Sequence, residues 1–337
     1  MITAIEVQNF GPFDSTTVLK LSPETFLIGP NNVGKSTFIA AYGTVALRSF
    51  NPEVTKFPSF LEASFGHRLD KQIALKVRAD TPAGEAERGI VLDRHNNLSL
   101  THSGNAEAVK HLEQILTSTW YLTSARVVVP HAQGLVGGEQ PRLDHIGSNI
   151  IRFLLERWTA RDPGWDEAER WLRKIDPGLV QLKSPLRGLE ASLETSRKYP
   201  SGTGFDVNVA YQGGGVQRAL QVLSALVFSP PGSVISIEEP EMNLHPAAQE
   251  TLVDLFNHAT NEWGKQIIVT SHSWNMVLPF ISDIGPGSKR GADHIRADPS
   301  KFRLVTFSFE EGGIRLHDYD LTKEFKQIRD DFKMIWG

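Results

Sequence analysis

A single short segment constrains the fold of this 337-residue chain more than any other part of it. Its residues are Gly29, Pro30, Asn31, Asn32, Val33, Gly34, Lys35, Ser36 and Thr37. The segment fits the pattern G-x-x-x-x-G-K-[ST], in which a glycine-rich turn points backbone N–H groups at a phosphate chain. An apolar run precedes it and an apolar helical pattern follows it, which predicts a strand, a phosphate loop and a helix whose positive end faces the anion. The alternative is a glycine turn that binds nothing.

The last residues of the motif are of the types that hold a nucleoside triphosphate and its metal ion. Lys35 is expected to reach the β- and γ-phosphates, and the Ser36 hydroxyl to be a Mg²⁺ ligand. The segment therefore predicts ATP and Mg²⁺ as cofactors, bound by residues 29–37.

The composition bears on the compartment and the class of partner but does not indicate a specific function. The net charge is −4, from 35 Lys and Arg against 39 Asp and Glu, so no overall basic field indicates nucleic acid or an anionic membrane. The absence of cysteine excludes disulfides, thiolate zinc sites and cysteine nucleophiles, and is compatible with the cytosol. The first residues lack the pattern of a signal peptide, and no apolar run has the length of a membrane span. We expect a cytoplasmic protein with no membrane segment.

A second informative segment is the β-rich run at 233–241, which ends in adjacent acidic residues. A strand end with two carboxylates suits metal-assisted hydrolysis, since one can hold the Mg²⁺ shell while the other activates water. We assign Glu238 the metal role and Glu239 the role of general base. The alternative is two solvated glutamates at a strand end.

Two further motifs also lie where a strand pattern ends or a helical pattern begins. The strand pattern at 267–270 leads to His272, which at the same sheet edge can donate a hydrogen bond to a γ-phosphate oxygen. A purely structural histidine is the alternative. Before a helical pattern at 216–228 stand Gly213, Gly214 and Gly215, with Gln217 close behind, and these form a second anion-binding helix start. One phosphate chain rarely needs two such loops.

The remaining patterns predict the frame around these motifs. Alternating segments at 72–79 and 89–100, with a turn at Asn96-Asn97, indicate an antiparallel lobe. Helices are expected at 106–116 and twice within 146–175, where the tryptophans have the spacing of packing residues. A loop is expected at 196–204 between strands at 189–193 and 205–210, then a hairpin at 301–316 and a charged helix at 322–335.

The order of phosphate loop, glycine-rich loop, acidic strand and histidine strand resembles the ABC-type ATPase core. Within that class, FLIGPNNVGKST, ISIEEPEMNLHPAAQ and IIVTSHS resemble the ATPase domains of the overcoming-lysogenization-defect (OLD) family and of RecF-, Rad50- and SMC-like proteins. The resemblance implies an α/β fold: a P-loop NTPase with a mixed sheet core, an antiparallel β lobe and an inserted helical subdomain. We expect the core and lobe at 1–102 and 211–337, and the insertion at 103–210.

The resemblance also implies how the two glycine loops are used. Two protomers would pack head to tail, with each ATP touching the phosphate loop, Glu238, Glu239 and His272 of one subunit. The other subunit would contribute Gly213, Gly214, Gly215 and Gln217. ATP would then assemble at least a dimer and hydrolysis would release it, because only the triphosphate makes differential contacts with the closed state.

Three residues depart from the family pattern. Gly214 stands where many relatives have a serine that contacts the γ-phosphate. Glu238 replaces an aspartate, as it does in other OLD-like proteins. His245 replaces the aspartate of transporters and SMC proteins, which argues against a transporter subunit. The glutamine that senses Mg²⁺ in this class has three candidates, namely Gln72, Gln133 and Gln140.

Three functions remain open. The first is an ATP-driven switch acting on DNA or an effector protein, in phage defence or genome maintenance. The second is an OLD-like nuclease or nuclease subunit, although only about 60 residues follow the histidine strand, too few for a separate α/β nuclease domain. The third is a scaffold that binds ATP without hydrolysing it. DNA has the weakest support, because acids interrupt the basic residues of the C-terminal region.

Overall fold

A computed structural model gives the fold of the chain. It describes residues 1–50, 57, 59–67, 70–95, 97–124, 129–134, 142–198, 202, 204–279, 300–311, 313–319 and 328, and only the backbone of 60 and 61. Gln140, the turn residue Asn96 and, except for residue 328, the helix expected at 322–335 lie outside these residues.

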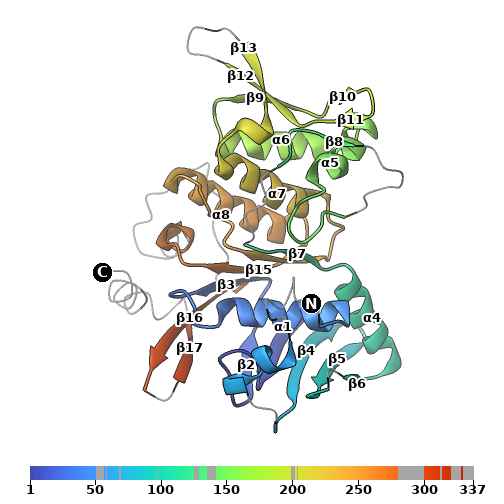
Figure 1. The fold of residues 1–337 in the computed structure, drawn as a ribbon, viewed down its shortest axis with the longest axis vertical. Helices are drawn as coiled ribbons and strands as arrows, with labels where there is room; N and C mark the ends of the chain where they lie inside the picture. The colour runs from blue at the N-terminus through green and yellow to red at the C-terminus, as the bar shows by residue number, and fades with distance from the viewer. Residues whose placement is uncertain are drawn as a thin grey trace.

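A six-stranded mixed sheet forms the centre of the molecule, in the order β17-β16-β3-β15-β14-β7 (Figure 1). Its strands in chain order are β3 (Glu24–Ile28), β7 (Trp120–Leu122), β14 (Val234–Glu238), β15 (Gln266–Ser271), β16 (Phe302–Glu310) and β17 (Gly313–Tyr319). All neighbours are parallel except β16 and β17, which form the predicted terminal hairpin. Every residue of β3, β14 and β15 is buried, as expected of parallel strands covered on both faces. The predicted mixed core is confirmed.

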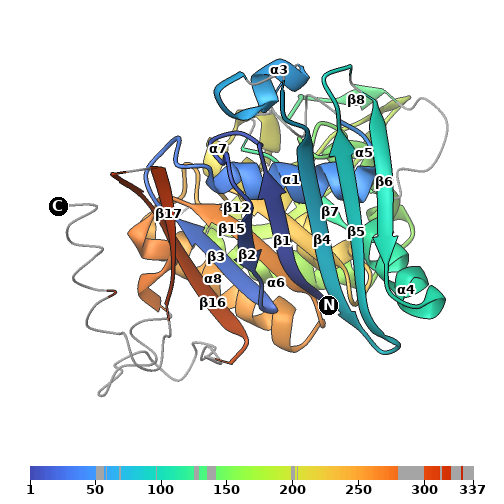
Figure 2. The same ribbon diagram turned by 90° about the horizontal axis from the view of Figure 1, so that it is seen from below.

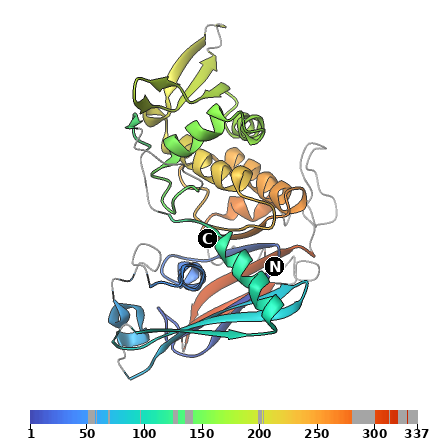
Figure 3. The same ribbon diagram turned by 90° about the vertical axis from the view of Figure 1, so that its right-hand side faces the viewer.

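Helices cover the two faces of this sheet, and the strands alternate between two cores. On one face lies α1 (Lys35–Leu47), against which Leu27 packs in the same cluster as Phe38. On the other lie α7 (Gly214–Phe228) and α8 (Pro246–Asn261) (Figure 3). Phe26 points to this second face, where its ring centroid lies 6.0 Å from that of Phe256 on α8. One strand therefore joins the phosphate loop to both cores.

A five-stranded antiparallel sheet, in the order β2-β1-β4-β5-β6, lies beyond α1 as the predicted lobe (Figure 2). Its strands are β1 (Ile2–Gln8), β2 (Thr17–Lys20), β4 (Ile73–Thr81), β5 (Gly84–Leu92) and β6 (Leu98–Ser103). The structure has one more hairpin than expected. The strands β4 and β5 form a hairpin through Pro82-Ala83, and β5 then pairs antiparallel with β6. The first half of β5 is Gly-Glu-Ala-Glu-Arg, which has weak β propensity and hid that strand.

The insertion combines two helices with two small sheets, at the top of Figure 1. The helices are α5 (Ile150–Thr159) and α6 (Gly164–Ile175), where Trp165 and Trp171 are buried in the core. One sheet pairs β8 (Gln133–Gly134), β10 (Leu186–Arg187) and β11 (Glu190–Ala191), and the other pairs β9 (Leu179–Lys183), β12 (Glu194–Lys198) and β13 (Gly204–Asn208). We call the second sheet the arm. The loop expected from 196 was wrong for 196–198, which are paired strand residues of β12.

The boundary of the insertion differs from the expected 103–210. The helix α4 (Ala106–Thr117) packs on β5 of the lobe, and β7 pairs with β14 in the core sheet. Both elements lie inside the expected range but belong to the core and lobe by packing. We therefore propose that the insertion begins after β7.

Four short helical turns complete the described chain. They are α3 (Phe60–Ala63), η1 (Phe65–His67), η2 (Val209–Tyr211) and η3 (Trp274–Met276). No helix among the described residues has both the length and the apolar character to span a bilayer.

Candidate functional site

The phosphate-loop motif lies between β3, which ends at Ile28, and α1, which begins at Lys35. Gly34 is the N-cap of α1 with a left-handed φ of 85°. A Cβ on Gly34 would lie 2.7 Å from Cγ of Pro12 and 2.8 Å from the ring of Phe13. Both the conformation and the close approach of the lobe therefore require glycine here. The helix start behind it is open toward an anion.

Lys35 folds back over its own loop. Its Nζ donates hydrogen bonds to the carbonyl oxygens of Gly29, at 2.6 Å, and Pro30, at 2.5 Å. Burial lowers the pKa of Lys35 to about 8, against the carboxylates of Glu239 and Glu241, which raise it. A partly buried ammonium that is bonded only to carbonyls is well suited to exchange them for phosphate oxygens.

A cavity of about 830 Å³ opens over this loop. It brings Lys35 and Ser36 of the phosphate loop together with Glu239, which lies about 200 residues further along the chain. The loop residues that line it are Asn31, Asn32, Gly34, Lys35, Ser36 and Thr37. Its size and convergent polar groups are typical of a small-molecule site.

The far wall of this cavity was missed by the sequence analysis. It is built by α3 and η1 through Glu62, Ser64, Phe65, Gly66 and His67. Ser124 and Thr270, at the ends of β7 and β15, also line the cavity. The stretch at 62–67 has no periodicity or motif, so only the folded chain reveals its place beside the phosphate loop.

Glu238 lies at the end of β14 with no exposed surface. Its carboxylate accepts hydrogen bonds from the Tyr121 hydroxyl at 3.3 Å and from the Ser124 backbone N–H at 3.0 Å. The buried Tyr121 hydroxyl has a raised pKa, first through burial and then through the charge of Glu238. Arg218 donates to the Glu238 carbonyl oxygen. The carboxylate of Glu238 is thus fixed beside the end of β7, and Glu238 is not among the described residues that line the cavity.

Glu239 is the next residue and points elsewhere. It has a left-handed φ of 46°, and its backbone N–H donates to the Thr270 carbonyl at 2.8 Å. A non-glycine residue in this region carries strain, which structures keep mainly at functional sites. The turn of the chain separates the two adjacent carboxylates, with Glu239 in the cavity and Glu238 behind it.

His272 follows β15, and its Nδ1 lies 3.7 Å from Oε1 of Glu239. It is not among the described residues around the large cavity, but it lines a neighbouring one of about 470 Å³. Glu241 lines the same neighbouring cavity, with its Oε1 4.0 Å from Nδ1 of His272. Glu241 is the last residue of the acidic run at 233–241, where only Glu238 and Glu239 had been assigned roles.

The glycine-rich loop precedes α7, with Gly213 as its N-cap. Gly213 and Gly214 are exposed, whereas Gly215 is buried against the turn after β14. A Cβ on Gly215 would lie 2.5 Å from the carbonyl oxygen of Asn243, so close packing within the protomer explains this glycine. A Cβ on Gly214 would meet only the Asn243 side chain, at 3.0 Å. None of the three is among the described residues that line the large cavity.

Gln217 is buried one turn into α7, and its amide is bonded at both ends. Its Oε1 accepts from the Val129 N–H at 2.9 Å, and its Nε2 donates to the carbonyls of Val209 and Gln212, at 3.2 and 3.1 Å. In this structure Gln217 therefore ties the start of α7 to the chain at both ends of the insertion.

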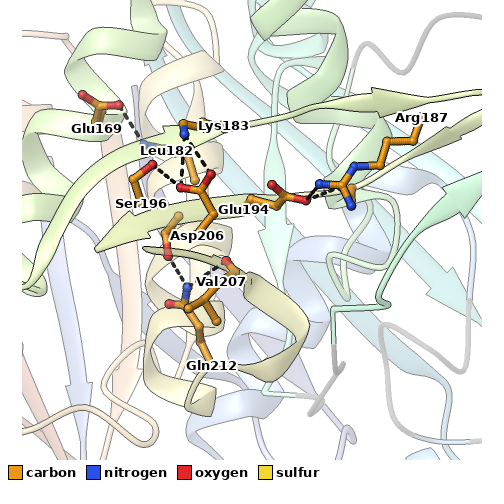
Figure 4. A network of polar contacts seen from close by, with 11 residues as sticks. Glu169, Leu182, Lys183, Arg187, Glu194, Ser196, Asp206, Val207 and Gln212 are labelled. Carbon is orange, nitrogen blue, oxygen red and sulfur yellow. Dashed lines mark hydrogen bonds and ion pairs between the residues drawn. The ribbon is translucent and has the colours of Figure 1, made fainter. Parts of the chain in front are cut away.

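Gln212 connects the glycine-rich loop to the arm. Its Nε2 donates to the Thr195 hydroxyl on β12 and, at 3.5 Å, to the Val207 carbonyl on β13. Its Oε1 accepts from Arg197 of β12 at 3.0 Å. Figure 4 shows Gln212 beside Val207, below the strands whose outer face carries the bonds between Lys183, Ser196 and Asp206. The residue directly before Gly213 is thus hydrogen-bonded to the arm.

The other candidates lie away from the cavity. Gln133 is in β8 of the insertion, where its Oε1 accepts from the Arg152 N–H at 3.4 Å. Gln72 directly precedes β4. Neither is among the described residues around the large cavity. His245 is the N-cap of α8 and its Nδ1 accepts from the Ala247 N–H at 3.4 Å, a capping role that an aspartate can also fill.

Solved structures with a similar fold include heads of SMC proteins. An SMC head bound to the C-terminal winged-helix domain of ScpA has 13% identity and a TM-score of 0.66, over 96% of this chain and 99% of that one. A head from Pyrococcus furiosus with an extended coiled coil, bound to the C-terminal domain of ScpA, has 11% identity and a TM-score of 0.64, over 98% and 99%. A head from Thermotoga maritima has 14% identity and a TM-score of 0.55, over 94% and 98%. These likenesses show the fold.

Two family models match the sequence. The model described as "AAA ATPase domain" matches residues 1–73. The model AAA_21, described as "AAA domain, putative AbiEii toxin, Type IV TA system", matches residues 91–277, more than half of the chain. No curated protein sequence matches the chain significantly. Because this match covers more than half of the chain, the chain belongs to the AAA_21 family, and its fold is the ABC-type ATPase fold of SMC heads.

Proposed function

We propose that this protein binds and hydrolyses Mg-ATP at sites shared between two copies, and that the nucleotide state switches its action on an effector protein or DNA. The observation that carries the proposal is the convergence of Lys35, Ser36 and Glu239 on one cavity of about 830 Å³. A phosphate ligand, a metal ligand and a general base are the groups that ATP hydrolysis requires. The family and the fold are those of ATPases.

Each residue has a defined part in this proposal. The loop at 29–37 would hold the phosphates through its N–H groups, and Lys35 would exchange its two carbonyl partners for phosphate oxygens. Glu239, strained into the cavity, would take the proton of the attacking water. His272 would donate to the γ-phosphate after its ring turns toward the cavity. This turn is needed because the ring now lines the neighbouring cavity.

The oxygen donors at this site fit magnesium. Ser36 lines the cavity and carries a hydroxyl oxygen, and behind the cavity Glu238 offers a carboxylate held by Tyr121 and Ser124. Hard divalent cations prefer such oxygen ligands, directly or through water. When bound, Mg²⁺ would supply positive charge to the β- and γ-phosphate oxygens. Ser36 and Glu238 are the residues that would hold it.

The glycine-rich loop supports a site completed by a second copy. Gly213 and Gly214 are exposed at the start of a helix of 15 residues, outside the described lining of the protomer's own cavity. A positive helix end without a ligand in its own chain suits the triphosphate of a partner protomer. Gly213, Gly214 and Gly215 would offer backbone N–H groups there, and Gln217 would hold the loop in shape.

The proposed effector and pathway are supported only by similarity to other proteins. The AAA_21 description names a putative toxin of a type IV toxin–antitoxin system, which agrees with a role in phage defence. SMC heads similar to this chain are solved with a bound partner protein, which supports an effector protein over DNA alone. An ATP-dependent nuclease and a scaffold that does not hydrolyse ATP are the competing functions.

The substitution Glu239→Gln tests the proposal. We expect phosphate release to fall at least about 100-fold while Mg-ATP binding is retained, since only the proton acceptor is lost. The trapped ATP should also shift the variant to a dimer or larger species in sedimentation. Glu87→Gln, on the lobe surface, is the matched control and should behave as wild type.

Two outcomes would count against the proposal. If neither the wild type nor Glu239→Gln releases phosphate, with or without DNA and co-purified proteins, the result would favour a scaffold that binds ATP without hydrolysing it. Cleavage of plasmid DNA by the purified chain with Mg-ATP would favour the nuclease.

A further inference from the structure

We propose that Glu241 is a positioning residue that sets the place of His272 relative to Glu239. It does so by accepting two hydrogen bonds, one from the last residue of β15 and one from the turn that follows it. The inference rests on the proposed ATPase function. It assigns a role to a carboxylate that the phosphate-loop motif, the acid pair and the histidine do not account for.

The contacts of Glu241 are directed at one short turn. Its Oε1 accepts from the Ser271 hydroxyl and, at 3.2 Å, from the backbone N–H of His272. The Ser271 hydroxyl oxygen in turn accepts from the Ser273 N–H at 2.9 Å. One carboxylate oxygen thus fixes the backbone and side chain on both sides of the histidine.

The same contacts join two strand ends. Glu239 and Glu241 belong to the turn after β14, and His272 to the turn after β15. Within the protomer these turns are also joined by the Glu239 N–H, which donates to the Thr270 carbonyl at 2.8 Å. Nδ1 of His272 lies 3.7 Å from Glu239 and 4.0 Å from Glu241. Glu241 therefore holds the histidine beside the general base and limits how far the two turns can separate.

Burying the carboxylate of Glu241 lowers the stability of the fold, which argues against a purely structural role. Its side chain is only 4% exposed, and burial raises the pKa of its carboxyl group. Its Oε2 is buried and accepts no hydrogen bond from the described residues. A buried, half-satisfied carboxylate costs stability, and native proteins keep such groups mainly where function needs them. The position next to His272 supplies that need.

The test compares Glu241→Ala with Glu241→Gln. Alanine removes the acceptor, so we expect kcat for ATP to fall about 10- to 100-fold with KM within about threefold, as for other residues that orient a catalytic group. Glutamine keeps an oxygen that can accept both bonds and should restore most of the rate. The matched control is Glu262→Ala at the far end of α8, which should match wild type.

A second readout does not depend on hydrolysis. In nucleotide-free protein labelled at histidine, the ring resonance of His272, assigned by its loss in His272→Gln, should move in Glu241→Ala and stay near its position in Glu241→Gln. If the chain proves inactive as an ATPase, this spectrum still tests the positioning role.

Three results would overturn the inference. They are an unmoved His272 resonance in Glu241→Ala, a kcat within twofold of wild type, or equal losses in the alanine and glutamine variants. If Glu241→Ala does not fold, Ser271→Ala takes its place, since it removes one of the two donors. The His272 resonance should then move as well, and its failure to move would also count against the role.

Discussion

At the scale of single residues, Lys35 makes the phosphate site sensitive to pH. Burial lowers the pKa of its ammonium group to about 8, so the charge is lost as pH rises through that value. The charged form binds phosphate, and we expect nucleotide affinity to be greatest below pH 8. Above it, affinity should fall about tenfold per pH unit until the pKa of the complex is reached. Calorimetric titration of the wild-type protein with Mg²⁺ and a non-hydrolysable ATP analogue between pH 7 and 9.5 measures this, since replacing Glu239 would itself shift the pKa of Lys35.

Lys35→Arg is the control for this pH dependence. A guanidinium stays charged over the whole range, so its affinity should be flat with pH even if it is weaker. A wild-type affinity that is also flat above pH 8 would show that Lys35 keeps its proton there, and would contradict the expectation.

At the scale of elements, the glycines at the start of α7 differ in role: packing within the protomer requires Gly215, whereas it does not require Gly213. Gly215→Ala places a methyl group 2.5 Å from the Asn243 carbonyl, so the turn after β14 must move. We expect a loss of about 1–3 kcal/mol in the free energy of unfolding, measured with urea. Gly213→Ala has no atom within 4 Å of the new Cβ and a φ of −57°, so its stability should stay within about 0.5 kcal/mol. Equal losses in the two variants would refute this division.

The lobe offers a second prediction at this scale. Arg88 on β5 is 1% exposed, and its guanidinium bonds Glu113 of α4 and the Val45 carbonyl near the end of α1. Burial lowers the pKa of Arg88 despite the pull of Glu113. Glu113→Gln leaves a buried charge without its partner and should cost about 3–5 kcal/mol of unfolding free energy.

Glu87→Gln provides the comparison for that ion pair. Glu87 pairs with Arg78 on the exposed face of the same lobe, where loss of the pair should cost at most about 1 kcal/mol. A Glu113→Gln variant that unfolds at the same urea concentration as Glu87→Gln would mean that water reaches Arg88.

Elements with strong local signals were predictable, and those held by distant partners were not. The runs of β3, β14 and β15 have apolar centres and are buried throughout because both faces are covered. The helix α1 is buried on almost every side, and its apolar composition next to the phosphate-loop motif was the signal. The end of β12, with Ser196 and Lys198, has no such signal and is a strand because β13 pairs with it. Tertiary pairing outweighed propensity there.

The candidate site shows the same limit. Motifs located the phosphate loop, the acid pair, the histidine and the glycines, since each needs particular residue types at fixed spacing. Glu241 and the cavity wall of α3 and η1 carry no spacing signal. Their places depend on which strand ends lie side by side. The large share of the cavity formed by residues 62–67 could not be derived from the chain alone.

At the scale of the whole molecule, a shared site predicts complementation between two defective variants. Lys35→Ala damages the phosphate loop and Gly213→Glu puts a repelling charge on the opposing loop. In a mixed head-to-tail dimer one site receives both defects and the other receives neither. Random pairing at equal amounts should therefore restore about a quarter of wild-type phosphate release, from two nearly inactive proteins.

Two controls make the result decisive. Each variant alone must be nearly inactive at the same total concentration, and a mixture of Lys35→Ala with Glu239→Gln must stay inactive, since both defects lie on the same side of the site. Activity that fails to rise in the first mixture, while both proteins still assemble, would mean that each copy contains its own complete site.

The hydrogen bonds of Gln212 have a practical consequence for protein engineering. Because this side chain is anchored on Thr195, Val207 and Arg197, the segment from β9 to the start of α7 behaves as one module. A chimera that exchanges the hairpin of β12 and β13 but keeps the native Gln212 would cut through that module and remove the Thr195 and Arg197 side chains that bond its amide. Designers who wish to give this ATPase a new binding head should place their junctions before β9 and between Gln212 and Gly213, so that Gln212 moves with its partners and the glycine-rich loop stays with the core.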